Sequence, residues 1–179
     1  FTALAFAQDE LTWSFSLEDK GNGEIDLVAD VKIKQGWHLY DTEIPDGGPT
    51  PTQISFDKIV GAVPVGKFHA EGKKASVKYD DIFRMNVGTF ENNARFVQRL
   101  KVTDKGAFSI EGDVRAQACD DSSCTPPLPH DFTFTGSHLP ATVSAAVTNG
   151  STQGDEQTTE TDLSIEDKVN KLIIKSNNR

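Results

Sequence analysis

The sequence predicts an all-β protein, an immunoglobulin-like two-sheet sandwich with a flexible C-terminal linker and a short terminal helix. From residue 11 onward, apolar residues alternate with polar ones, which is the period of a half-buried strand. Short runs of this kind are separated by turn signals such as "PDGGP" and "TDKGA". No convincing helical pattern precedes residue 140. Many short strands at such spacing favour two antiparallel sheets packed face to face.

The first ten residues, "FTALAFAQDE", begin without methionine and are apolar as far as Ala7. Ala5, Phe6 and Ala7 stand before Gln8 in the small-x-small pattern of a signal-peptidase site. We interpret residues 1–7 as the remnant of an export signal; a first strand or a cloning remnant is the alternative. Export would place the cysteines in an oxidising compartment, where disulfides persist.

Two alternating runs on either side of the turn "DKGNGE" predict a first hairpin. Their apolar residues are Leu11, Trp13, Phe15, Leu17, Ile25, Leu27, Ala29, Val31 and Ile33. Shorter strand-like runs follow at residues 54–56, 63–65, 96–102, 108–114 and 132–134. We expect these runs to complete the two sheets.

The C-terminal part of the sequence changes character. Residues 149–162 contain no aliphatic or aromatic side chain, so they cannot bury enough surface to offset their ordering entropy, and we predict a linker. Apolar residues then recur at helical spacing after Ser164, a candidate N-cap; they are Ile165, Val169, Leu172 and Ile173. This short amphipathic helix belongs either to a part of the protein further downstream or to the surface of the sandwich.

Length and charge restrict the classes of function. With 179 residues, 36% of them hydrophobic, the chain is long enough for one domain with a substantial core and a tail. A formal net charge of -9 works against binding nucleic acid or an anionic membrane surface, because both would be repelled. No apolar run approaches the about 20 residues that cross a bilayer, so we expect this stretch of chain to be soluble.

The two cysteines lie together in "AQACDDSSCTPPLP". The alternation before Cys119 places it at the end of a strand, and "DDSS" forms a tight loop back to Cys124. Pro126 and Pro127 hold the exit from the loop extended. A bond closing so small a loop stabilises by only about 2 kcal/mol, against nearly 5 for a loop of about 100 residues. Such a bond is better suited to being opened and closed by another thiol.

Other roles for the cysteines find less support in the sequence. Zinc needs four ligands, and the histidines His38, His69, His130 and His138 are scattered, with only His130 close to the cysteines. Nothing specifies which histidine would serve a protease-type nucleophile, and no signature of such an enzyme is present. We therefore expect no metal and no cofactor. An exported binding or adhesion module with a purely structural disulfide stays open, because the fold does not decide function.

Four stretches carry a resemblance to a known family: "GWHLY" at 36–40, "PTQISF" at 51–56, "YDDIF" at 79–83 and "AQACDDSSCTPP" at 116–127. Together they resemble the N-terminal periplasmic domains of the thiol:disulfide interchange protein DsbD, a protein-disulfide reductase. The resemblance covers roughly residues 9–140, and the cysteine stretch is its most specific part. The cysteine loop is one residue shorter than in the best-known members, which leaves the exchange chemistry intact.

The resemblance implies an immunoglobulin-like redox domain at residues 8–148. Residues 149–179 would then lead to a missing membrane-embedded electron carrier and a thioredoxin-like domain, so the full-length protein would be anchored in the inner membrane. The periplasmic domain would accept two electrons from that thioredoxin-like domain. It would pass them to thioredoxin-fold partners such as disulfide isomerases through mixed disulfides, in electron transport that includes cytochrome c biogenesis.

The resemblance also implies the site residues. Cys119 and Cys124 would carry the exchange, Cys124 bonding to the partner and Cys119 resolving the intermediate. The stretch "KYDDIF" would form a lid whose capping side chain is Ile82 or Phe83, with Phe83 preferred. Trp37 and Tyr40 would line the same site; the alternative is that these three aromatic residues belong to the core.

Carboxylates are expected near the cysteines as well. Asp80 and Asp81 lie within the lid stretch, and Asp120 and Asp121 directly follow Cys119 in the sequence. Negative charge disfavours a thiolate, so these groups would slow the reduced form until a partner displaces or screens them. Solvated loop acids without such a role are the alternative.

Overall fold

The structure is a computed structural model that describes residues 9–138 and 142–144. Every regular element in this range is a β-strand, and the strands pair in antiparallel fashion. The strands are β1 (Leu11–Gly21), β2 (Glu24–Ile33), β3 (His38–Tyr40), β4 (Gln53–Val60), β5 (Ala62–Ala70), β6 (Ser76–Asp80), β7 (Met85–Phe90), β8 (Asn93–Val102), β9 (Phe108–Arg115), β10 (Ala118–Cys119), β11 (Pro129–Gly136) and β12 (Thr142–Ser144).

The predicted export signal at 1–7 and the predicted linker and helix at 149–179 lie outside the described residues. These predictions and the domain boundaries drawn from them therefore stay predictions. Within the part of the chain that is described, there is no helix with the length and apolar character to cross a bilayer.

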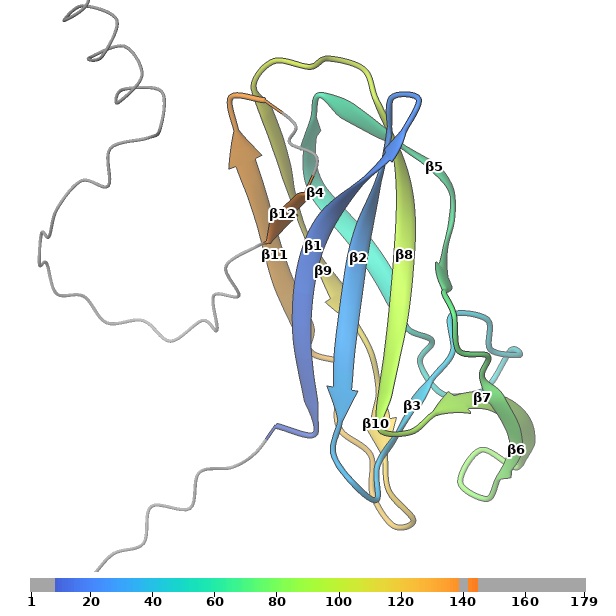
Figure 1. Ribbon diagram of the computed structural model, residues 1–179. Coiled ribbons are helices and arrows are strands. Elements are labelled where there is room, and N and C mark those ends of the chain that lie inside the picture. Colours follow the sequence, from blue (N-terminus) through green and yellow to red (C-terminus); the bar gives the residue numbers. More distant parts are fainter. Residues whose placement is uncertain (1–8, 139–141, 145–179) are drawn as a thin grey trace, which may run out of the picture. The chain divides into compact units, whose positions relative to one another are not determined.

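The predicted immunoglobulin-like sandwich is confirmed (Figure 1). A five-stranded sheet in the order β12-β1-β2-β8-β5 packs against a three-stranded sheet in the order β11-β9-β4. Aromatic side chains join the two layers, with the ring centroid of Phe132 5.3 Å from that of Phe15 in the opposite sheet. Burial of these inward-facing side chains is the main source of stability for the fold.

The predicted first hairpin has the expected register, with Leu11 opposite Ile33. Its tip is the two-residue loop Asn22 and Gly23, which have positive φ angles of 55° and 75°. An Asn-Gly pair suits a type I′ turn because both positions need positive φ, and this turn matches the twist of paired strands.

The sequence did not predict the four-stranded sheet, which has the order β10-β3-β7-β6. β3 is only three residues long, and β6 is an edge strand whose first four residues are all exposed, so neither shows an alternating pattern. The alternation from residue 114 to 119 also crosses two strands. β9 ends at Arg115 in one sheet, and the chain enters the other sheet at Ala118.

This small sheet carries the residues around the cysteines. Cys119 on β10 pairs with His38 on β3, and β3 pairs in turn with β7. β7 completes a hairpin with β6, at the lower end of the view in Figure 1. Three successive strand pairings therefore fix the disulfide, the strand β3 and the β6–β7 hairpin relative to one another.

Candidate functional site

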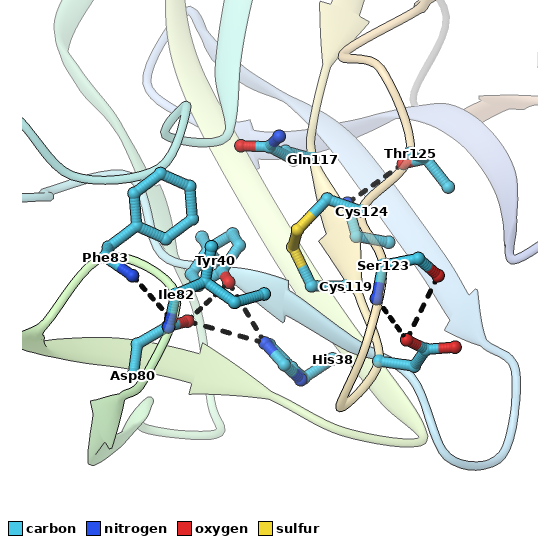
Figure 2. The surroundings of a disulfide bond; sticks show 12 residues. His38, Tyr40, Asp80, Ile82, Phe83, Gln117, Cys119, Ser123, Cys124 and Thr125 are labelled. Atoms are coloured by element: carbon cyan, nitrogen blue, oxygen red, sulfur yellow. Dashed lines mark hydrogen bonds and ion pairs between the residues drawn. A yellow bond between two sulfur atoms is a disulfide. The ribbon is translucent and has the colours of Figure 1, made fainter.

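Cys119 and Cys124 are joined by a disulfide that spans a very short hairpin (Figure 2). The backbone N–H of Thr125 donates to the carbonyl of Ala118 at 2.7 Å. The N–H of Asp120 donates to the carbonyl of Ser123 at 2.9 Å. Backbone hydrogen bonds therefore close the hairpin on both sides of the cysteine pair.

The side chain of Asp120 organises the turn of this hairpin. Its Oδ1 accepts hydrogen bonds from the backbone N–H groups of Ser122 at 2.8 Å and Ser123 at 2.7 Å. Both serine hydroxyls lie 3.1 Å from the same oxygen. The backbone hydrogen bonds from Ser122 and Ser123 lower the pKa of Asp120. Hydrogen bonds of its own therefore hold the turn, in addition to the disulfide.

The two cysteines differ in burial. Cys119 is 0% exposed and packs with Tyr40 and Val87, whereas Cys124 is partly exposed at the edge of this group. We call this group the disulfide cluster; its other members are Ile44, Phe83 and Met85. Cys124 is therefore the more exposed cysteine of the pair.

A hairpin tip between β6 and β7, which we call the cap hairpin (residues 80–85), approaches the disulfide cluster. Asp80 initiates it, since its Oδ1 accepts the N–H groups of Ile82 at 2.9 Å and Phe83 at 3.1 Å. The carbonyl of Asp80 also accepts the N–H of Arg84 at 2.7 Å, and Arg84 turns the chain back with a φ of 57°. A single aspartate thus fixes the conformation of the tip.

The cap hairpin directs its two candidate capping side chains differently. Phe83 is partly buried in the disulfide cluster, and its ring meets that of Tyr40 edge-on with centroids 6.1 Å apart. Ile82 is 50% exposed. Figure 2 shows Phe83 and Ile82 on the same side of the sulfur atoms. Phe83 thus packs against the cluster that contains Cys119, whereas Ile82 lines the pocket beside the cysteine loop.

The two other aromatic residues proposed for the site pack in different places. Trp37 directly precedes β3, and Tyr40 is the last residue of β3. Trp37 and Leu39 pack with the main core, whereas Tyr40 is fully buried in the disulfide cluster. The structure thus brings Tyr40 to the site and places Trp37 elsewhere, which corrects the expectation for Trp37. His38 lies two positions before Tyr40 on β3 and so shares its face of the strand, although the sequence analysis did not select it.

His38, Tyr40 and Asp80 form a hydrogen-bonded group beside the disulfide (Figure 2). The Tyr40 hydroxyl donates to Oδ2 of Asp80 at 2.6 Å, and Nε2 of His38 lies 3.1 Å from that hydroxyl oxygen. Burial raises the pKa of Tyr40, and the hydrogen bond to Asp80 adds to the rise. Burial lowers the pKa of His38, although the charge of Asp80 opposes it.

Asp80 stays ionised in this setting. Burial acts to raise its pKa, but hydrogen bonds from Tyr40, Phe83 and Ile82 outweigh burial, so the pKa of Asp80 is lowered. The carboxylate therefore holds the cap hairpin with one oxygen and the Tyr40 hydroxyl with the other.

A pocket next to the cysteine loop gathers carboxylates from two loops. Its lining includes all four predicted aspartates, Asp80, Asp81, Asp120 and Asp121. Glu91 and Lys78 also line it and form an ion pair of 2.6 Å with each other. The local charge is therefore strongly negative, which disfavours a thiolate in the reduced protein.

The described residues include no group of three or more histidine, cysteine, aspartate or glutamate side chains placed to hold a metal ion. Of the four histidines, only His38 lies beside the disulfide. His130 packs on Trp13 in the sandwich, with ring centroids 5.8 Å apart.

Comparison with known proteins gives one family. The family model described as "Thiol:disulfide interchange protein DsbD, N-terminal" matches residues 4–136. A comparison with curated proteins gives no match.

Solved structures with similar chains were also found. The N-terminal domain of Neisseria meningitidis DsbD in the reduced form has a TM-score of 0.45 and 16% identity, covering 75% of this chain and 90% of that chain. The N-terminal periplasmic domain of ScsB from Proteus mirabilis has a TM-score of 0.49 and 14% identity, with coverage of 72% and 46%. The complex of the DsbD and PilB N-terminal domains from Neisseria meningitidis has a TM-score of 0.43 and 14% identity, covering 78% of this chain and 94% of that chain.

Proposed function

Because the chain belongs to the family of N-terminal domains of the thiol:disulfide interchange protein DsbD, we propose that it is a thiol–disulfide exchange module whose working bond joins Cys119 and Cys124. The family and the disulfide together support exchange as its chemistry. The observation that carries the proposal further is the asymmetry of the bond, with Cys119 buried and Cys124 partly exposed beside Phe83. This arrangement suits a bond that one partner opens from one side.

In the proposed reaction the oxidised domain accepts two electrons. A thiolate of the donor attacks Sγ of Cys124, the disulfide breaks, and its electron pair passes to Sγ of Cys119, which takes up a proton. The second thiol of the donor then attacks the mixed disulfide and releases Cys124. The donor leaves as a disulfide, and the domain leaves as a dithiol.

The forward transfer reverses these roles. Cys124 as a thiolate attacks the disulfide of an oxidised partner and forms a mixed disulfide with it. Cys119 then attacks Cys124 and releases the partner as a dithiol, which makes the module a protein-disulfide reductase. Neither half of the cycle requires a metal or a cofactor, because the two sulfur atoms carry both electrons.

Phe83 and the surrounding carboxylates would limit reactions with the wrong thiols. The ring of Phe83 covers the disulfide cluster until a partner displaces the cap hairpin. The aspartates around the pocket would keep the reduced cysteines protonated until the partner screens their charge. Both effects favour transfer inside a protein complex over reaction with small molecules.

We further propose the setting in which this exchange takes place. The domain would act in the periplasm as part of an inner-membrane protein, with the thioredoxin-like domain of the same full-length protein as donor. Exported thioredoxin-fold proteins such as disulfide isomerases would receive the electrons, including those for cytochrome c biogenesis. A disulfide that cycles between its oxidised and reduced forms needs an oxidising compartment and, separately, a dedicated donor of electrons. This setting provides both.

A direct transfer experiment tests the function. The oxidised protein is mixed with a reduced thioredoxin-fold protein, the reaction is stopped by alkylation, and the alkylated cysteines of each protein are counted by mass. We expect Cys119 and Cys124 to become alkylated while the donor becomes oxidised in equal amount. A variant with both cysteines changed to alanine is the control and should leave the donor reduced. Failure of the native protein to oxidise the donor would instead favour an exported binding or adhesion domain with a structural disulfide.

A further inference from the structure

A directed chain of hydrogen bonds links His38 to the cap hairpin. The Tyr40 hydroxyl has one hydrogen, and the short contact of 2.6 Å to the carboxylate of Asp80 uses it. The contact of 3.1 Å between this hydroxyl and Nε2 of His38 therefore needs its hydrogen from the imidazole. Neutral His38 must then carry its hydrogen on Nε2, which leaves Nδ1 as the free base.

This chain of hydrogen bonds ends at the tip of the cap hairpin, which carries Phe83. His38 donates to Tyr40, Tyr40 donates to Oδ2 of Asp80, and Oδ1 of Asp80 accepts the N–H groups of Ile82 and Phe83. Every donor in the chain points toward the same carboxylate. A change at His38 therefore reaches the cap hairpin through only two side chains.

We propose that His38 is a positioning residue for the cap hairpin, holding it closed as the neutral imidazole and loosening it when a proton is added. This inference deepens the proposed function and rests on it, because a cap matters only over a reactive disulfide. His38 also pairs with Cys119 across β3 and β10, so the residue that holds the cap lies opposite the buried cysteine.

The surroundings of His38 favour its neutral form when the cap is closed. The side chain is 24% exposed, and among the described residues no protein atom accepts a hydrogen bond from Nδ1. A second proton would thus create a partly buried N–H group that needs water as its partner. Burial lowers the pKa of His38 from its ordinary value, in agreement with a ring whose Nδ1 has no protein partner in the closed arrangement.

Some of the charged groups around His38 favour protonation of its ring, and one opposes it. Asp80 on β6, with Oδ2 3.9 Å from Nε2, attracts the protonated ring, as do Glu91 beyond β7 and Asp121 in the cysteine loop. Lys78 on β6 repels it. Burial outweighs the net attraction of these groups, so the pKa of His38 lies below its ordinary value.

Two substitutions at His38 separate the effect of its N–H donor from the effect of its positive charge. His38→Gln keeps an N–H donor for Tyr40 but cannot gain a proton, and His38→Phe keeps an aromatic ring but lacks the donor. The rate of disulfide reduction by a neutral hydroxyalkyl phosphine is measured for each protein from about pH 4.5 to about pH 8, around the ordinary histidine pKa of about 6.5. Ratios between proteins at each pH cancel the protonation of the reagent.

We expect the native protein and His38→Gln to react within about twofold of each other near pH 8. In acid the native protein should become about threefold faster than His38→Gln, because only the native side chain gains a charge. His38→Phe should exceed His38→Gln by about threefold at every pH, since it lacks the donor throughout. A native-to-Gln ratio that stays flat with pH, or that falls in acid, would overturn the proposal.

A nuclear magnetic resonance titration of the oxidised protein gives a readout that needs no redox partner. The imidazole nitrogen shifts should show the Nε2–H form of His38, and the ring signals of Phe83 should shift with the same midpoint as His38. In His38→Gln the Phe83 signals should lose this titration. An Nδ1–H form, or Phe83 signals that ignore the titration, would contradict the proposal even if electron transfer succeeds. Coupled titration without electron transfer would instead remove only the proposed function.

Discussion

Replacing Cys119 by alanine is expected to leave a protein that forms a stable mixed disulfide through Cys124, whereas Cys124→Ala should form little. The reason is the difference in burial, since Cys119 is 0% exposed and Cys124 is partly exposed. A thioredoxin-fold partner that lacks its resolving cysteine is first converted to its thionitrobenzoate disulfide. The thiol of the variant then attacks the activated sulfur, and the released thionitrobenzoate and the covalent complex are both measured.

The trapping experiment has three outcomes with separate meanings. A complex with Cys119→Ala alone supports the assigned roles, because no second thiol is present to resolve it. A complex with Cys124→Ala alone would exchange the roles of the two cysteines. No complex with either variant, when both are folded, would contradict exchange and favour a structural bond. The double variant, which has no thiol, is the control for background release.

Phe83→Ala is expected to raise the rate constant for reaction of the disulfide with glutathione by about tenfold, equivalent to about 1.4 kcal/mol in the barrier. The ring of Phe83 is partly buried in the disulfide cluster, where it packs edge-on against Tyr40. Its removal leaves the cluster open to solvent beside the sulfur atoms. Stopped-flow or quenched-flow measurement under excess glutathione gives the rate constant.

Ile82→Ala is the matched control for this effect. Ile82 precedes Phe83 on the same cap hairpin but is 50% exposed, so its truncation should change the rate by less than about twofold. Equal acceleration in both variants would point to general loosening of the hairpin. A folded Phe83→Ala protein with the native rate would remove Phe83 from the role of cap.

The parts of the fold that follow from the sequence are those with a buried face. The hairpin of β1 and β2 was predicted because its inward residues, such as Phe15 and Leu27, recur at every second position and because the turn signal "DKGNGE" separates the two runs. β6 gave no such signal, because an edge strand with exposed Val77 and Tyr79 has no buried face to reveal it. The small sheet depends on pairings between distant segments, which a local pattern does not specify.

The site shows the same division. Cys119, Cys124 and the stretch containing Phe83 were selected from the sequence, and the structure brings them together. Trp37 was expected to line the site, but it precedes β3 and packs against the main core. Alternation along the strand residues "HLY" would have selected His38 together with Tyr40. No local pattern, however, gives the hydrogen bonds that Asp80 makes with Tyr40, because they join segments far apart in the chain.

The reduction potential of the bond between Cys119 and Cys124 tests the central claim most directly. It is measured by equilibrating the protein with thiol–disulfide buffers of known potential and counting free cysteines after alkylation. Structural disulfides in exported proteins lie below about -300 mV, and exchange-active ones lie higher. An exchange module predicts a potential above about -300 mV, where thioredoxin-fold partners can reduce the bond and be reduced by it. A value well below that level would contradict the account and assign the bond a structural role.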